Sequence, residues 1–337
     1  MRILGIESSC DECAAAVVED GARVLSSVVL SQVDFHKPYY GVVPEIASRK
    51  HIEWIRAVIQ DALGQAGTPA ADVDAVAVTF RPGLIGSLLV GLSFAKGLAW
   101  ALGKPLVGVD HILAHLYAPH LEGEISYPYL GLLVSGGHTI IARVERCDAI
   151  QVLGTTIDDA CGEAFDKVAK HYGMGFPGGV AIDRLSRTGD PRSFRFPKPS
   201  LHKGHALYDV SYSGLKTAVI HQLDQFWDGT SEKSLPNIAA AFPRAAIDIL
   251  ADRLIAAAAD TGLRRVVAGG GVAANSYLRA RLGSERDLEV IFPSLALCTD
   301  NAAMVAGLGC QLFAEGKTST FALNAEARVP MFKRAYP

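Results

Sequence analysis

The length, composition and charge of the chain exclude several classes of protein. Its 337 residues exceed what one average core uses and suit two lobes of ordinary size, and 50% of them are hydrophobic. Charged residues make up 20% and the net charge is only −3, which excludes a protein that is basic overall and binds nucleic acid over its whole surface.

Two strand–turn–strand patterns, about 127 residues apart, organise the sequence. Residues 2–6 and 14–18 are short apolar runs around a polar turn, and residues 129–134 and 140–144 repeat this layout around a second turn. Such runs predict β-hairpins. Their repetition indicates an internal duplication of an α/β lobe.

The segments outside these hairpins alternate between helical and strand patterns. Apolar residues have helical spacing over residues 44–66, 84–102 and 236–261. Short apolar runs typical of strands cover residues 75–79, 106–109, 265–268 and 289–292. The alternation predicts an α/β fold with mixed sheets flanked by helices. We expect one lobe over 1–106 plus 301–337, a second over 107–300 with the metal and nucleotide motifs, and a central cleft.

The sequence also predicts where the protein works. The chain has no stretch of 18 uninterrupted apolar residues, so we expect no membrane span. It begins in an apolar strand and not in a signal peptide, and its six cysteines are scattered without the framework of a secreted protein. We therefore expect a cytoplasmic protein.

His111 and His115 are the first candidate metal ligands. They follow the predicted strand 106–109 and open a helix, where an i, i+4 pair lies on one face and can hold one ion. A surface helix that carries two histidines by chance is the alternative. Ile112 occupies the position of the general-base glutamate of zinc peptidases, so that protease mechanism is not predicted.

Asp300 can complete this metal site. It follows an apolar stretch and precedes a predicted helix, a common position for cleft residues in α/β folds, although an aspartate there can also cap the helix. Two histidines and one carboxylate would leave positions on Fe(II) or zinc open for a substrate oxygen.

Two glycine-rich turns predict contacts to a nucleotide. Residues 135–139, Ser-Gly-Gly-His-Thr, form a tight turn whose exposed N–H groups can bind phosphate oxygens, with an ordinary hairpin turn as the alternative. Residues 269–271 are three glycines after a buried strand, but Glu289 begins the next strand and does not end it, which argues against a dinucleotide fingerprint. We expect a turn that packs against a nucleoside, with Asn275 at the start of the next helix.

Residues 158–183 combine acidic residues with another glycine turn. Four carboxylates fall within residues 158–166, where a solvated helix start is the alternative. Gly178 and Gly179 follow, with Asp183 one helical turn later, so we expect this segment to line the same cleft.

Residues 184–205 are distinctly basic. Their cationic side chains are Arg184, Arg187, Arg192, Arg195, Lys198 and Lys203, and only Asp190 offsets them. A solvated loop and a surface that binds phosphates are both open interpretations.

Together these motifs resemble the universal tRNA N6-adenosine threonylcarbamoyltransferase family of bacterial type, once described as an O-sialoglycoprotein endopeptidase. The resemblance covers essentially the whole chain and rests on Ile3–Glu12, residues 41–49 and 82–87, His111–His115, Leu132–Thr139, Asp158–Lys167, Ser213–Thr217, Gly269–Asn275 and Cys298–Met304. It implies the duplicated α/β fold of the actin, sugar-kinase and heat-shock-chaperone superfamily. It also implies transfer of a threonylcarbamoyl group from threonylcarbamoyl-adenylate to N6 of adenosine 37 in tRNAs that read ANN codons, with release of AMP.

The resemblance assigns residues to this reaction. The family's metal ligands match His111, His115 and Asp300, for one divalent ion per subunit, with Fe(2+) favoured over Zn(2+). Its contacts to the adenylate or nucleotide match Val134, Ser135, Gly136, Gly137, His138, Asp166, Gly179, Asp183 and Asn275. Asp11 and Glu12 match an acidic turn needed for activity, and either is a candidate to orient or deprotonate the N6 amine.

The chain departs from the family pattern at four positions. Arg81 replaces a glycine, Tyr40 replaces the first glycine of a pair, and Cys13 and Cys161 replace a threonine and a small residue. None of these is an implied metal or nucleotide position.

The resemblance also implies partners. The bacterial family works with an inactive paralogue of similar fold and a small P-loop ATPase, and the absence of a Walker A motif in this chain agrees with ATP turnover in a partner. A metallopeptidase and a noncatalytic nucleotide-binding scaffold are the alternative functions.

Overall fold

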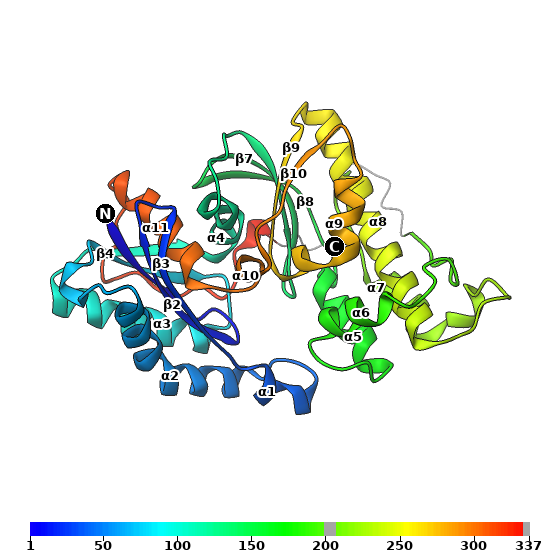
Figure 1. Cartoon of the computed structure of the whole chain (residues 1–337), viewed down its shortest axis with the longest axis horizontal. Coiled ribbons are helices and arrows are strands. Elements are labelled where there is room, and N and C mark those ends of the chain that lie inside the picture. The colour runs from blue at the N-terminus through cyan, green and yellow to red at the C-terminus, as the bar shows by residue number, and fades with distance from the viewer. Residues whose placement is uncertain (199–206, 333–337) are drawn as a thin grey trace. The chain divides into compact units, whose positions relative to one another are not determined.

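A computed structural model describes residues 1–198 and 207–332 (Figure 1). Contacts divide the chain into two units. Unit 1 comprises Met1–Ser126, Arg146–Ala149 and Pro293–Val329, and unit 2 comprises Tyr127–Glu145, Ile150–Phe292 and the residues from Pro330 on.

This division differs from the expected lobes of 1–106 plus 301–337 and 107–300. Residues 107–126 and Asp300 belong to unit 1, so unit 1 and not unit 2 carries the predicted metal ligands. The reason is local: the helix of His111 continues directly from the last strand of the unit 1 sheet and packs against the helix that follows Asp300.

Unit 1 is built on one five-stranded sheet with strand order β3-β2-β1-β4-β5. The strands are β1 (Arg2–Glu7), β2 (Glu12–Glu19), β3 (Arg23–Ser31), β4 (Ala75–Arg81) and β5 (Leu106–Asp110). β1 pairs antiparallel with β2 and parallel with β4, and β5 is parallel to β4. The mixed sheet that the sequence predicts is therefore confirmed.

Helices cover both faces of this sheet. The α-helices of unit 1 are α1 (Val33–His36), α2 (Pro44–Gln65), α3 (Ile85–Leu102), α4 (His111–Tyr117), α10 (Leu295–Cys298) and α11 (Ala302–Ala314). α2 and α3 pack on one face, while α4 and α11 share the core on the other (Figure 1). Because side chains alternate between the faces, Ala75 and Ala77 contact one core, and Val76 and Val78 the other. A sheet buried on both sides explains why its strands are continuous apolar runs.

By length and composition, α3 could cross a membrane, with a mean hydropathy of 1.6. One side of the helix is buried in unit 1, where Leu88, Leu92, Ala95 and Ala99 are at most 2% exposed. The core therefore explains the apolar residues on this side of the helix, while Ile85, Leu89 and Trp100 are exposed.

Unit 2 repeats the architecture of unit 1. Its strands are β6 (Tyr129–Val134), β7 (Thr139–Arg146), β8 (Ala149–Thr155), β9 (Arg265–Gly269) and β10 (Glu289–Ile291), in the order β10-β9-β6-β7-β8. β6 pairs antiparallel with β7 and parallel with β9, and β10 is parallel to β9. β6 thus has the place that β1 has in unit 1. The duplication inferred from the two hairpins is confirmed at the level of topology.

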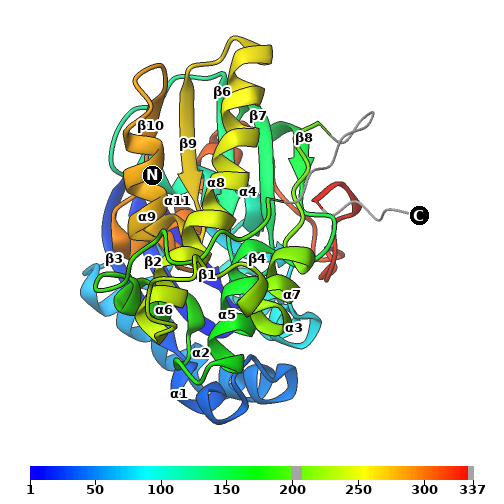
Figure 2. The same cartoon turned by 90° about the vertical axis from the view of Figure 1, so that its right-hand side faces the viewer.

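The helices of unit 2 are α5 (Cys161–His171), α6 (Gly178–Ser186), α7 (Ser213–His221), α8 (Leu235–Thr261) and α9 (Ser276–Gly283). The long helix α8 runs along the sheet (Figure 2) and also packs against α6 and α9. Several predicted elements agree with observed ones to within one or two residues: α2, α3 and α8, and strands β4, β5, β9 and β10.

Candidate functional site

Helix α4 presents His111 and His115 on one face. The helix follows β5 without a loop, because the buried side chain of Asp110 caps it: Asp110 Oδ1 accepts the N–H groups of Ile112 at 2.9 Å and Leu113 at 3.3 Å. The two imidazole rings lie edge to face with their centroids 4.6 Å apart.

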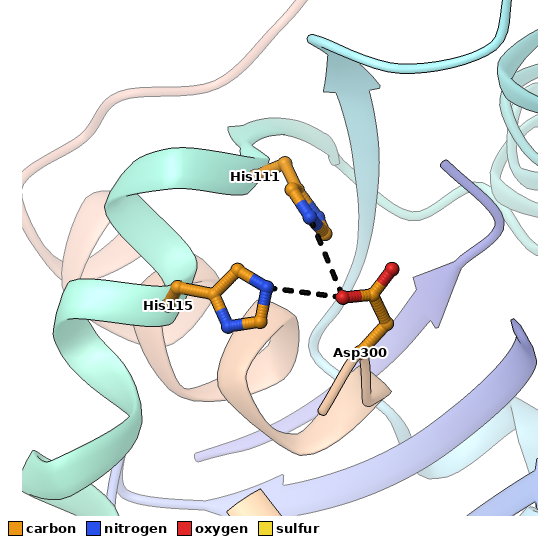
Figure 3. A group of neighbouring side chains, drawn as sticks. All are labelled: His111, His115 and Asp300. Carbon is orange, nitrogen blue, oxygen red and sulfur yellow. Dashed lines mark hydrogen bonds and ion pairs between the residues drawn. The ribbon is translucent and has the colours of Figure 1, made fainter. Parts of the chain in front are cut away.

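Asp300 faces both imidazoles from the loop between α10 and α11 (Figure 3). Its Oδ1 lies 3.0 Å from Nε2 of His115 and 3.6 Å from Nε2 of His111. The neighbouring Asn301 caps α11, since its Oδ1 accepts the N–H of Met304 at 3.0 Å. Asp300 is therefore not the capping residue that the alternative interpretation required.

The three side chains form a donor set that suits a divalent metal. One ligand atom from each of His111, His115 and Asp300 lies within 4.8 Å of the other two. Two imidazole nitrogens and one carboxylate oxygen are ligands that iron and zinc accept in proteins. The structure thus brings together the residues predicted to bind the metal, and their chemistry fits the group.

Burial and nearby carboxylates set the charge of the two imidazoles. Burial lowers the pKa of His111, but the charges of Asp300 and Glu7 and a hydrogen bond to Glu7 more than offset this effect and raise the pKa to about 9. For His115, burial and the charge of His111 lower the pKa despite its bond to Asp300. Without a metal, one imidazole is charged and the other is neutral at neutral pH.

Metal binding is therefore expected to release a proton from His111. The ion competes with that proton for the ring, so the apparent affinity should rise about tenfold per pH unit and level off above the pKa of about 9. The stability of the metal-free protein changes with pH in the opposite direction. The raised pKa of His111 stabilises the fold fully below the usual value of 6.5, and this stabilisation is lost as pH rises to about 9. Zinc titrations at a series of pH values measure the affinity, and a flat profile would contradict the assignment.

Glu7 is a neighbour of the site that the sequence did not single out. Its fully buried carboxylate lies 3.1 Å from Nδ1 of His111 and accepts hydrogen bonds from Thr79 Oγ1 at 2.6 Å and Ser9 N at 2.6 Å. A buried glutamate at the end of a strand that leads into a polar turn was the available signal.

Asp11 and Glu12 lie in and beside the turn between β1 and β2. The Asp11 carbonyl accepts the N–H of Gln32 at 3.0 Å, and Glu12 Oε1 accepts the Ser31 hydroxyl at 3.2 Å. Burial, followed by the charges of Asp11 and Asp300, raises the pKa of Glu12 well above its usual value. Glu12 therefore interacts electrostatically with the proposed metal ligand Asp300.

Two departures from the family pattern have structural consequences in unit 1. Arg81 Nε donates to Asp110 Oδ2 at 3.0 Å, and its guanidinium also pairs with Glu326 at 3.3 Å. Arg81 thus braces the residue that caps α4, the helix of the two candidate metal ligands. Tyr40 adopts a left-handed backbone conformation with φ of +52°, which is the conformation that favours the glycine it replaces.

The residues predicted to bind the nucleotide all lie in unit 2, where contacts join them into a ring. The Ser135 carbonyl accepts a hydrogen bond from Gly162 N in α5. Asp166, also in α5, accepts one from Gly178 N in α6. Asp183 in α6 in turn accepts one from Asn275 Nδ2. Gly270 closes the ring against β6: its φ is +90°, and a Cβ there would lie 2.5 Å from the Val134 carbonyl oxygen.

Open space borders this ring. A Cβ added at Gly136, Gly137, Gly179 or Gly271 would meet no atom within 4 Å, so these four glycines expose backbone. Within the turn itself, Ser135 Oγ accepts the N–H groups of Gly137 at 3.3 Å and His138 at 3.1 Å. The turn is thus held in shape by its own serine.

Two acidic side chains beside the ring have structural partners. Asp158 accepts the backbone N–H groups of Tyr212 at 2.8 Å and Ser213 at 3.2 Å and so anchors the start of α7. Asp159 pairs with Lys167 at 2.7 Å and Lys216 at 2.6 Å. In the predicted acidic cluster, Asp159 is therefore paired with cations and Asp158 has a structural role.

The basic segment 184–205 is described up to Lys198, and Lys203 lies outside the described residues. Its exposed cationic residues are Arg184, Arg187, Arg192, Arg195 and Lys198. Arg187 is 3.7 Å from Asp183, and Lys198 pairs with Asp252 at 2.9 Å. Among the described residues, Arg192 and Arg195 have no ion-pair partner within 4 Å.

Comparisons with family models and with curated proteins agree on one family. Residues 23–307 match the family model of tRNA N6-adenosine threonylcarbamoyltransferase. Curated proteins of that name are 60% identical in Treponema denticola, 53% in Treponema pallidum and 51% in Borreliella burgdorferi. These alignments cover at least 99% of this chain and 99%, 95% and 96% of the respective relatives.

Solved structures of similar fold are more distant in sequence. Component A of the (R)-2-hydroxyglutaryl-CoA dehydratase of Acidaminococcus fermentans is 15% identical with a TM-score of 0.56, over 93% of this chain and 99% of that one. Full-length HypF is also 15% identical, with a TM-score of 0.63 over 94% of this chain and 56% of that one. These neighbours have the actin-like ATPase fold, so the predicted fold class is confirmed.

The family model spans most of the chain, and the relatives match it almost from end to end. The three residues of the donor set fall within the segments that carried the resemblance, and so does the ring of glycine turns apart from its residues in α6. The chain belongs to the tRNA N6-adenosine threonylcarbamoyltransferase family.

Proposed function

We propose that this protein transfers the threonylcarbamoyl group of threonylcarbamoyl-adenylate to N6 of adenosine 37 in tRNAs that read ANN codons and releases AMP. Family membership supports the reaction. The observation that carries the chemistry is the convergence of Nε2 of His111, Nε2 of His115 and Oδ1 of Asp300.

His111, His115 and Asp300 would hold one divalent metal, for which we favour Fe(2+) over Zn(2+). When bound, the metal supplies a Lewis acid that binds and polarises oxygens of the threonylcarbamoyl group. The three ligands leave coordination positions free for such oxygens.

Asp11 and Glu12 are the proposed residues that handle the attacking amine. The exocyclic N6 of adenine is a poor nucleophile, so its orientation contributes much of the rate. A carboxyl group whose pKa is raised above its usual value, as that of Glu12 is, is a stronger base once it is ionised than an ordinary glutamate.

The ring of unit 2 is the proposed site for the adenylate. Its contacts would come from Val134, Ser135, Gly136, Gly137, His138, Asp166, Gly179, Asp183 and Asn275. The exposed backbone at Gly136, Gly137 and Gly179 supports this role, because a ligand can approach a glycine more closely than any other residue.

A peptidase has less support. Ile112 is fully buried at the position where the helix of a zinc peptidase carries its glutamate. A noncatalytic scaffold would not require the two imidazoles and Asp300 to converge.

We also propose the partners and the location implied by the family. An inactive paralogue of similar fold and a small P-loop ATPase would complete a bacterial complex, and the protein would work in the cytoplasm.

The reaction is tested by incubating the purified protein and its partners with threonylcarbamoyl-adenylate and unmodified tRNA. Mass spectrometry of the digested tRNA should show threonylcarbamoyladenosine. Failure to form it with the complete set of partners would refute the proposed function, and release of peptides from a protein substrate would favour the peptidase.

The basic segment yields a prediction about tRNA. Replacing Arg192 and Arg195 together by glutamate is expected to weaken tRNA binding. The negative slope of log affinity against log salt should become shallower by about 2, because each arginine would contact one phosphate. Filter binding at several salt concentrations measures both quantities. The control is the same charge change at the exposed residues Arg264 and Arg286 of unit 2. Equal losses in the two double variants would mean that only the overall charge matters.

A further inference from the structure

Glu7 is a buried carboxylate whose hydrogen-bond partners all lie around the metal ligands. Its side chain has no exposed surface. Oε1 accepts Ser9 N, and Oε2 accepts the Thr79 hydroxyl and lies 3.1 Å from Nδ1 of His111. A buried charge is costly unless it is paired and hydrogen-bonded, and Glu7 satisfies both conditions.

We propose that Glu7 is the positioning residue of the metal centre, which holds His111 in the one tautomer that can bind the metal. An ionised carboxylate can only accept, so Nδ1 of His111 must carry the proton. The lone pair is then on Nε2, the atom that faces Asp300. This inference rests on the proposed metal site.

The surroundings of His111 show why such control is needed. Ser9 Oγ lies 3.3 Å from the same Nδ1, and a hydroxyl can either accept a hydrogen bond from this nitrogen or donate one to it. If it donated, Nε2 would carry the proton and could not bind a metal. The carboxylate of Glu7 removes this ambiguity.

His115 lacks a comparable restraint. Its Nδ1 is buried and has no hydrogen-bond partner among the described residues, whereas its Nε2 faces Asp300. Of the two imidazoles, only His111 is thus fixed by a carboxylate behind it. Outer partners of metal-bound histidines typically account for a 10–100-fold difference in metal affinity, and here that effect would depend on Glu7.

The substitution Glu7→Gln tests this role with little change in size. If the amide oxygen still accepts the hydrogen bond from Ser9 N, the amide nitrogen faces Thr79 and His111. The amide then presents a donor to Nδ1 of His111, which in the metal-binding tautomer is itself a donor. We expect zinc affinity to fall roughly 10–100-fold in E7Q. In the zinc-loaded wild-type protein, nitrogen NMR should show a proton on Nδ1 of His111 that is protected from exchange, and in E7Q this proton should lose its protection.

Two further variants separate positioning from general damage. Glu19→Gln, on the adjacent strand β2, removes a carboxylate that pairs with Arg2 and Arg23 and should leave zinc affinity unchanged. Thr79→Val keeps the charge of Glu7 but removes one of its donors, so its loss of affinity should be smaller than that of E7Q. It also provides the test if E7Q does not fold.

The outcomes distinguish this inference from the proposed function. Equal zinc affinity in wild type and E7Q, or equal losses in E7Q and E19Q, would overturn the role of Glu7 alone. If E7Q does not fold and T79V is the test, a zinc affinity of T79V equal to that of wild type would also overturn the role of Glu7. If the wild-type protein takes up no zinc, the proposed metal site fails and the inference fails with it.

Discussion

Replacing His111 by alanine is expected to remove the bound metal and the transfer activity together. The variant leaves one imidazole and Asp300, and the carboxylate of Glu7 loses its partner 3.1 Å away. We expect metal affinity to fall by more than about 100-fold, since even the loss of an outer partner of a metal ligand has an effect of this order. Elemental analysis of the purified protein measures the metal, and nucleoside mass spectrometry measures the transfer.

His120→Ala is the matched control for this experiment. His120 follows α4 and stacks on Tyr117 with ring centroids 4.9 Å apart, but it is not part of the donor set. H120A should keep its metal. Full metal content in H111A would show that the ion binds elsewhere, whereas loss of metal with unchanged transfer would show that the reaction does not use it.

Replacing Gly179 by valine is expected to weaken binding of the adenylate without unfolding the protein. A Cβ at Gly179 meets no atom within 4 Å, so we expect the new side chain to extend into open space and to leave the fold intact. If the adenylate occupies that space, overlap with the valine should lower its affinity about tenfold or more. Calorimetric titration with AMP, the product that shares the adenylate group, measures the effect, and thermal unfolding checks the fold.

The control for this variant is Gly283→Val at the end of α9 in the same unit. A Cβ there also meets no atom within 4 Å, but Gly283 is not among the residues proposed to bind the nucleotide. G283V should bind AMP as the wild type does. Wild-type affinity in G179V would place the nucleotide outside the ring.

The local sequence determined most of the secondary structure and the duplicated topology. Apolar runs around the turns at residues 7–12 and 134–139 specify hairpins, because short strands separated by a polar turn pair with one another. The same reasoning could not place residues 107–126, since that segment begins inside a strand of one lobe and ends before a strand of the other. Packing of α4 against α11 decided it.

The candidate site divides in the same way. The i, i+4 spacing of His111 and His115 predicts that both imidazoles share a helical face, which is a property of local geometry. Asp300 was a plausible third ligand from its position before a helix, but only the structure assigns the cap to Asn301 and turns Asp300 toward the imidazoles.

Glu7 shows most clearly what the sequence alone could not give. It is 104 residues from His111, and neither residue's neighbours in the chain indicate the contact. The parallel pairing of β1 with β4 and of β4 with β5 brings the ends of these three strands to one edge of the sheet, and with them Glu7, Thr79 and the start of α4. The sequence thus determined the elements and the pair of candidate metal ligands on one helix. The partners of that pair were decided by strand order, because hydrogen bonds between distant segments form only when the sheet is assembled.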